Sequence, residues 1–168
     1  ALSPWWDRAL VTLYMATFGV VISCLIGFTV GTICFQNKKS AAFMLGVCDI
    51  FQTFPSFVYL IPVMMLFGIT DTSVLIAVIV YATIPATRYT IEGLRSVPAA
   101  LHDAATMSGV TKFQRLFKIE FPLAFPHMML GLNQTIVFAL FMVIIGAFIG
   151  TEDLGQYILK ALSDKKGA

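Results

Sequence analysis

Few side chains in this sequence have the types and spacing that catalysis or metal binding requires. His102 and His127 are the only histidines, and neither stands in a Ser/His/Asp or Cys/His arrangement. The cysteines lie in or beside apolar runs without a CxxC pair, which favours small buried side chains over a metal site or a disulfide: Cys24, Cys34 and Cys48. The phosphate-binding motif GxxxxGK followed by Ser or Thr does not occur. We therefore expect no catalytic residue, no metal site and no ATP-binding site in this chain.

A second group of polar residues lies inside long apolar runs, where each needs a partner: Asp49, Gln52, Thr53, Asn133 and Gln134. Asp49 falls about 13 Å along a helix from the lysines at 38–39, and an ionisable group at that depth is stable only when it is paired or faces water. The group is therefore a candidate translocation pathway. As an alternative, the Asp49 carboxylate reaches the nearer membrane surface or caps backbone groups freed by Pro55. The amides are as consistent with hydrogen bonds between helices as with substrate contacts.

The composition indicates what kind of elements must position these residues. Hydrophobic residues make up 58% of the 168 residues and charged residues only 12%, and the mean hydropathy is +0.87. A soluble domain contains about 45–50% apolar residues, and one of this length could not bury the excess. The sequence therefore predicts an all-α polytopic membrane protein. A net charge of +2 is too small to suggest that it binds nucleic acid.

We expect a single transmembrane domain over residues 1–168, with spans at about 9–35, 41–68, 74–91 and 127–150 and a loop at 92–125. Small residues recur at every fourth position of the first span, which favours close packing against another helix: Gly19, Ser23, Gly27 and Gly31. Pro55 and Pro62 predict that the second span is one kinked helix. Pro85 and Arg88 are expected to interrupt the third span near its end.

The distribution of basic residues predicts the orientation. Seven lysines and arginines fall in or beside the first and third loops, and four fall on the other side. Because positive charge gathers on the cytoplasmic side, we expect the N-terminus outside and the loop at 92–125 inside. A final span that would return the chain to the cytoplasm is expected to be missing.

Within this cytoplasmic loop the pattern predicts two short helices joined at a glycine. Ser96 is a suitable N-cap, and Pro98 fits the first turn of the helix that follows. Gly109 suits the left-handed position that ends a helix. Thr111 and Gln114 form a capping box that begins the second helix.

The same loop contains residues at a fixed spacing: Asp103, Ala104, Ala105, Gly109, Ile119, Phe121 and Pro122. This spacing resembles the E-A-A-x3-G-x9-I-x-L-P loop in the permease subunits of bacterial ABC importers with the type I fold. Asp replaces Glu at the first position, and Phe replaces Leu before the proline. Residues 52–67, 91–97, 131–135 and 150–156 are similar to the branch of that family that transports glycine betaine, choline and proline betaine.

The resemblance implies a helix-turn-helix loop attached to four core helices of a type I importer domain, and it implies roles for individual residues. The loop would couple the membrane helices to a separate ABC ATPase subunit, which binds ATP and magnesium. The residues that would form this coupling contact and its anchor are Asp103, Ala104, Ala105, Gly109, Ile119 and Pro122. The other implied partners are a second permease subunit, forming a homodimer, and an extracellular or periplasmic substrate-binding protein. The multi-pass permease would lie in the bacterial plasma (inner) membrane and move a quaternary-amine osmolyte such as glycine betaine, choline or proline betaine by alternating access.

Three alternatives remain open from the sequence. The first is an ABC importer permease for another small solute, such as methionine, another amino acid or an organic anion. The second is a secondary transporter in which Asp49 is the coupling carboxylate. The third is a membrane scaffold that transports nothing.

Overall fold

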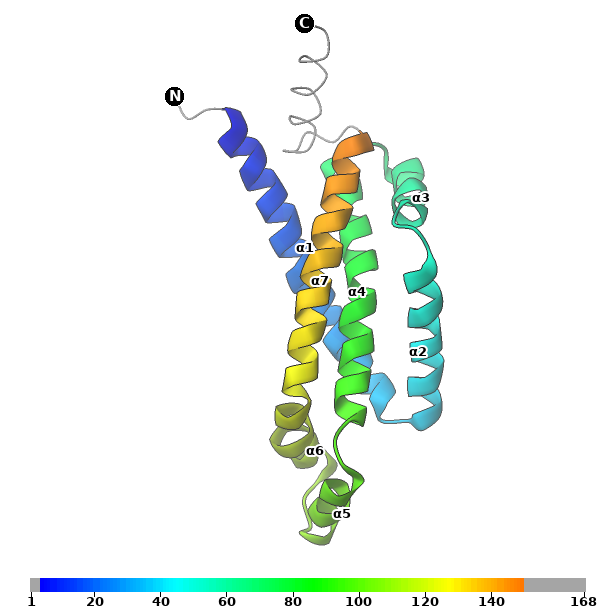
Figure 1. Cartoon of the computed structure of the whole chain (residues 1–168), viewed down its shortest axis with the longest axis vertical. Coiled ribbons are helices and arrows are strands. Elements are labelled where there is room, and N and C mark those ends of the chain that lie inside the picture. Colours follow the sequence, from blue (N-terminus) through cyan, green and yellow to red (C-terminus); the bar gives the residue numbers. More distant parts are fainter. Residues whose placement is uncertain (1–3, 150–168) are drawn as a thin grey trace, which may run out of the picture.

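Three long helices form a bundle in the computed structural model, which describes residues 4–149. They are α1 (Pro4–Phe35), α4 (Asp71–Arg95) and α7 (Phe121–Ile149), and α4 packs extensively against both of the others (Figure 1). In the described part of the chain, three helices are long and apolar enough to cross a membrane, or four if a bent helix pair counts as one span. The all-α membrane fold expected from composition is confirmed.

The close contact between α1 and α4 depends on the small residues that recur along α1. A Cβ added at Gly31 would lie 2.7 Å from Cβ of Thr90, and one added at Gly27 would overlap Ala86. Ser23 is fully buried in the same contact, and its hydroxyl donates a hydrogen bond to the Ile79 carbonyl at 3.1 Å. Small side chains therefore let the two backbones approach, as the four-residue spacing predicted.

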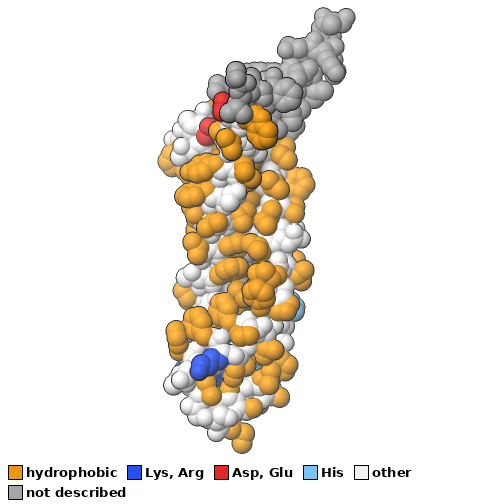
Figure 2. Space-filling view, turned by 90° about the vertical axis from the view of Figure 1, so that its left-hand side faces the viewer, with side chains coloured by type: hydrophobic (Ala, Val, Ile, Leu, Met, Phe, Trp, Pro, Cys, Tyr) orange, Lys and Arg blue, Asp and Glu red, His pale blue; other side chains and the backbone are white. Residues whose placement is uncertain are grey.

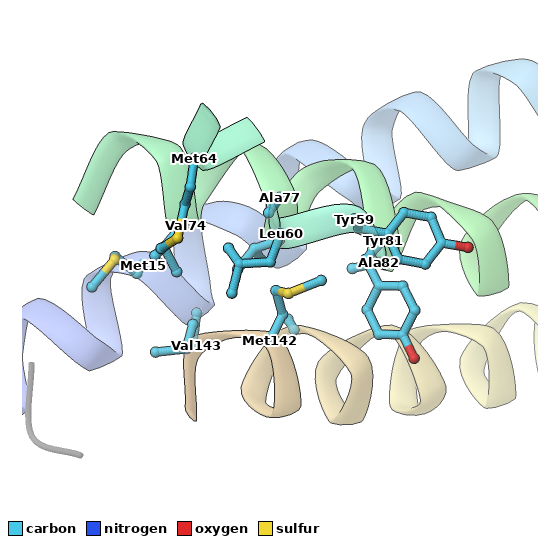
Figure 3. Close-up of a cluster of buried hydrophobic side chains, with 13 residues drawn as sticks. Met15, Tyr59, Leu60, Met64, Val74, Ala77, Tyr81, Ala82, Met142 and Val143 are labelled. Atoms are coloured by element: carbon cyan, nitrogen blue, oxygen red, sulfur yellow. The ribbon is translucent and has the colours of Figure 1, made fainter. Parts of the chain in front are cut away.

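The largest buried cluster lies where α1, α4, α7 and α3 (Phe57–Phe67) meet (Figure 3). Met15 of α1, Leu60 of α3 and Val74 of α4 are at most 1% exposed, as are Met142 and Val143 of α7. Outside this core, hydrophobic side chains cover the bundle surface along most of its length in Figure 2. An apolar outer surface of this extent is typical of a membrane-spanning bundle or of one packed against another subunit.

The second span differs from the single kinked helix that the sequence predicted. Residues 41–68 contain the end of α2 (Lys38–Thr53) and the whole of α3, and the two helix axes are bent by 86°. Phe54, between them, is extended at φ −77° and ψ 138°, because the ring of Pro55 disfavours helical backbone in the residue before it. Pro62 lies inside α3 without breaking it.

The third and fourth spans are parts of longer helices. α4 continues through Pro85 and Arg88 to Arg95, so the expected interruption is wrong. The hydroxyl of Thr87 donates to the Thr83 carbonyl at 2.9 Å, within the same helix. α7 begins at Phe121 instead of residue 127 and is described as far as Ile149, so the end of the fourth span at 150 and the motif at 150–156 lie outside the described residues.

Between α4 and α7 the chain forms a hairpin at the opposite end of the bundle from the start of α1 (Figure 1). Its elements are α5 (Ala99–Met107), α6 (Lys112–Arg115) and the π-helical turn η1 (Leu116–Glu120). We call residues 96–120 the hairpin.

Candidate functional site

The turn at Gly109 is built as the sequence predicted. Gly109 has a φ of +66°, which glycine adopts without steric strain. The Val110 N–H donates to the Ala105 carbonyl at 3.2 Å and the Gly109 N–H to the Thr106 carbonyl at 3.1 Å, which together form a Schellman motif. This arrangement satisfies carbonyl groups at the end of α5 and reverses the chain.

The capping box after this turn is also confirmed. The Gln114 N–H donates to Oγ1 of Thr111 at 3.3 Å, and the Thr111 N–H donates to Oε1 of Gln114 at 3.1 Å. The expected N-cap of α5 is wrong, however. Ser96 has helical backbone angles at the end of α4, and its hydroxyl donates to the Gly93 carbonyl at 2.7 Å. Pro98, with ψ at 136°, is the residue that precedes α5.

The second arm of the hairpin is not a separate helix. α6 runs into η1 and then into α7, so one helical path of 36 residues extends from Lys112 to Ala147. In η1 the Phe121 N–H bonds to the Leu116 carbonyl five residues earlier. The next residue, Pro122, has no N–H to donate, and this weakens the ordinary four-residue pattern at the same point. Any displacement of the hairpin's second arm therefore acts directly on a membrane helix.

The residues that match the permease pattern divide into two groups in space. Ala104, Ala105, Ile119 and Pro122 line one hollow of about 540 Å³ between α5 and the η1–α7 path. Ala105 is only 4% exposed, so its side chain faces this chain's own interior. Asp103 is exposed on α5, and the space where a Gly109 side chain would project is open. On α5 and its turn, Asp103, Ala104 and Gly109 thus remain accessible to another molecule, and Ala105 packs the hairpin against itself.

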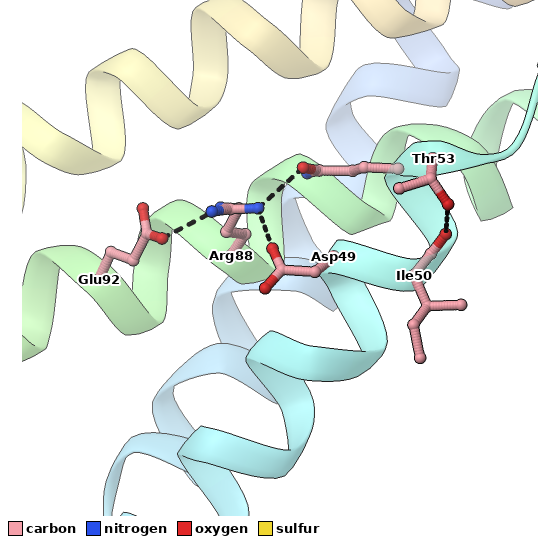
Figure 4. Close-up of polar contacts among 6 residues, drawn as sticks. Asp49, Ile50, Thr53, Arg88 and Glu92 are labelled. Atoms are coloured by element: carbon pink, nitrogen blue, oxygen red, sulfur yellow. Dashed lines mark hydrogen bonds and ion pairs between the residues drawn. The ribbon is translucent and has the colours of Figure 1, made fainter.

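The intramembrane carboxylate of Asp49 is paired with Arg88, which brings α2 against α4 (Figure 4). Nη1 of Arg88 also donates to Oε1 of Gln52 at 3.0 Å, and its Nε donates to Oε1 of Glu92 at 3.0 Å. Arg88 is therefore the common partner of three side chains. We call this group, Asp49, Gln52, Arg88 and Glu92, the Arg88 network.

The other pathway candidates do not join this network. Thr53 donates its hydroxyl to the Ile50 carbonyl at 2.7 Å, within its own helix. On α7, Asn133 is exposed and Gln134 is half-buried, and neither amide has a hydrogen-bond partner among the described residues. The structure thus brings together Asp49 and Gln52 but leaves Thr53, Asn133 and Gln134 apart from them.

Sequence reasoning missed three charged residues that the structure brings into contacts: Arg88, Glu92 and Glu120. Arg88 and Glu92 are four residues apart, a spacing that favours an ion pair on one helix and could have revealed them. The contact of Glu120 with α5 could not be predicted from neighbouring residues, because its partner there, His102, is distant in sequence.

Comparison with known proteins places the chain in a family. Residues 7–166 match the family model described as "Binding-protein-dependent transport system inner membrane component". The chain is 92% identical over all 168 residues to the trimethylamine N-oxide transport system permease protein TmoV of Pelagibacter ubique, and it covers 23% of that protein. It is 38% identical over 157 residues to the glycine betaine/proline betaine transport system permease protein ProW of Escherichia coli, covering 94% of this chain and 44% of ProW. The chain thus spans less than half the length of these relatives.

A solved structure supports the same fold. An inward-facing structure of the MetNI methionine ABC transporter matches with a TM-score of 0.77 at 21% identity, over 89% of this chain and 76% of that one. The expected permease fold and the multi-pass inner-membrane location are confirmed by these matches. On the residues matched, the chain belongs to the family of binding-protein-dependent transport system inner membrane components.

Proposed function

We propose that this chain forms part of the translocation pathway of an ATP-driven importer for a small methylated amine. The observation that carries the proposal is the hairpin: residues of the permease pattern lie on α5 at one end of the bundle, and the second arm continues without a break into α7. A subunit that moves the hairpin would therefore move a membrane helix. ATP and magnesium would be bound by that partner subunit.

The coupling contact that we propose lies on the exposed side of α5. Asp103 and Ala104 are exposed there, and Met107 is 89% exposed. The inward-facing Ala105, together with Ile119 and Pro122, would anchor the hairpin and not touch the ATPase subunit. Nucleotide binding would then bias two states of the membrane helices through this contact.

In the membrane, we propose that the Arg88 network lies beside the translocation pathway. Asp49 is more than half exposed, so this carboxylate is accessible from outside the protomer although it is paired. Thr53, Asn133 and Gln134 remain proposed pathway residues. We also propose that a second copy of the complete permease covers exposed apolar faces of the bundle and that an extracellular or periplasmic binding protein delivers the substrate.

The substrate class follows from the relatives' names. Trimethylamine N-oxide is the first candidate because two TmoV proteins are 92% and 50% identical to this chain. Glycine betaine and proline betaine are the second candidates, since permeases named for them are 38% and 36% identical. These solutes share a methylated nitrogen that is positively charged, and aromatic side chains of a binding protein can recognise this group.

The test is uptake by the complete transporter that contains this chain, reconstituted in proteoliposomes with its ATPase subunit and binding protein. We expect uptake of labelled trimethylamine N-oxide that requires ATP on the side of the membrane where the ATPase subunit is bound. Unlabelled glycine betaine should compete with this uptake more weakly than unlabelled trimethylamine N-oxide does. A partner ATPase whose phosphate-loop lysine is replaced provides the control and should abolish uptake. Uptake by the permease without ATP would contradict the proposal and favour a secondary transporter. ATP-driven uptake of an unmethylated solute alone would contradict the substrate class.

A further inference from the structure

α5 is held to the rest of the chain by few contacts. Ala105 is its only buried residue, and α5 makes no extensive contact with another helix in the described part of the chain. A hollow lies on either side of it. One is the 540 Å³ hollow beside Ala105, and the other, of about 640 Å³, is lined by residues that include Ala99, His102 and Glu120. Packing alone therefore leaves space into which α5 can tilt.

A buried carboxylate connects α5 to the second arm of the hairpin. Glu120, at the end of η1, is only 2% exposed. Its Oε1 lies 3.0 Å from Nδ1 of His102 on α5 and accepts a hydrogen bond from Nε of Arg115 at 2.9 Å. We call these three residues the Glu120 linkage. Because an unpaired buried carboxylate is strongly unfavourable, both partners are held against it.

The π-helical turn explains why Glu120 can reach α5. Each residue added to a helical turn rotates the following side chains by about 100°. η1 contains such a wide turn, and it buries Glu120 while Phe117 and Lys118 remain exposed. π-turns of this kind are frequent at functional sites. The linkage therefore joins α5 to the position where the hairpin becomes α7.

We propose that His102, Arg115 and Glu120 are positioning residues that make α5 and the start of α7 move as one unit. This inference rests on the proposed function, because it assigns the linkage a part in transmitting the ATPase subunit's movement. With the linkage intact, a displacement of α5 is passed to α7. Without the linkage, α5 moves into the two hollows, and its displacement is not passed to α7.

Two substitutions at His102 separate this role from a merely structural one. His102→Leu removes the donor to Glu120, whereas His102→Asn keeps an N–H donor at the position of Nδ1. His127→Leu is the matched control, since His127 is exposed on α7 and has no partner among the described residues. The variants are made in the complete transporter and compared for substrate transported per ATP hydrolysed. Backbone hydrogen exchange in residues 99–107 is measured on the same preparations.

We expect His102→Leu to lower the substrate transported per ATP by about tenfold, the scale of a typical coupling between two sites. Exchange should become faster in residues 99–107 and stay unchanged in α1 and α4. His102→Asn should restore most of the coupling, and His127→Leu should resemble the parent protein. Equal transport per ATP in the parent and His102→Leu proteins would overturn the proposal, as would equal losses in the Leu and Asn variants or faster exchange throughout the bundle.

The exchange measurement keeps this proposal distinct from the proposed function. A parent transporter without ATP-dependent uptake would refute the function. Unchanged exchange in residues 99–107 of His102→Leu would refute the linkage, whatever the parent transports.

Discussion

Arg88 matters more than Asp49 in the network between α2 and α4, because Arg88 has three partners and Asp49 has one. The sequence indicated Asp49 as the candidate, because a carboxylate inside an apolar run requires a partner or water. Arg88 was expected to interrupt the third span, and no partner was predicted for it. Only the packing of α2 against α4 brings Arg88 to Asp49 and Gln52.

The first prediction concerns this asymmetry. Arg88→Gln leaves Asp49 without its cationic partner and should lower the midpoint of thermal unfolding in detergent. Asp49→Asn should lower it less, because Arg88 keeps Glu92 and Gln52. Since both side chains are partly exposed, the coupling between them should be about 1 kcal/mol.

A double-mutant cycle with Asp49→Asn and Arg88→Gln measures that coupling, and Lys118→Gln serves as a control that removes an exposed charge elsewhere. Equal unfolding midpoints in all variants would contradict a stabilising network. If Asp49 also lies in the translocation pathway, Asp49→Asn should reduce uptake beyond the loss of folded protein.

At the level of elements, the sequence predicted the turn and the second cap of the hairpin, which neighbouring residues decide, but not the bend and the linkage that contacts between distant segments decide. The Schellman turn at Gly109 and the capping box at Thr111 depend on neighbouring residues, and both are present. The small face of α1 was also predictable from its four-residue spacing. The 86° bend at Pro55 was not, because proline indicates a bend without giving its size.

The same distinction applies to the candidate coupling site. Its residues were identified by spacing, but their exposure was not, since Ala104 and Ala105 are adjacent and line the same hollow, yet only Ala104 is exposed. The continuity of α6 with α7 was missed because a π-helical turn has no simple sequence signature. The Glu120 linkage was missed because its partner on α5 is brought close only by the hairpin.

The second prediction tests the turn that shapes the hairpin. Gly109→Ala places a side chain in a left-handed conformation and should destabilise the turn by about 1 kcal/mol. Nothing lies within 4 Å of a Cβ added at this position, so any loss comes from backbone strain and not from a clash. We expect weaker binding of the ATPase subunit to the complete permease, measured by co-purification at several salt concentrations.

Gly46→Ala is the matched control for this change. Gly46 is also free of atoms within 4 Å of an added Cβ, but it lies inside α2 with ordinary backbone angles. This substitution should leave ATPase binding unchanged and stabilise the helix slightly. Similar losses of binding in the two variants would show that the Gly109 conformation is not what the partner requires.

For the whole molecule, the arrangement of charge agrees with the location of the hairpin. The hairpin contains Lys112, Arg115 and Lys118, and Figure 2 shows a Lys or Arg side chain near that end, whereas the middle of the same face is covered by hydrophobic side chains. This pattern favours a cytoplasmic hairpin by the positive-inside rule.

We propose that α5 is the contact through which an ATPase subunit acts on this bundle. The most direct measurement is photo-crosslinking in the complete, assembled transporter, with the crosslinking residue at Met107, which is 89% exposed on α5. Phe125 on α7, 55% exposed, provides the control position. We expect an adduct with the ATPase subunit from position 107, changing in yield when ATP binds, and none from position 125. An assembled transporter that gives no adduct at position 107, or equal adducts at both positions, would contradict it.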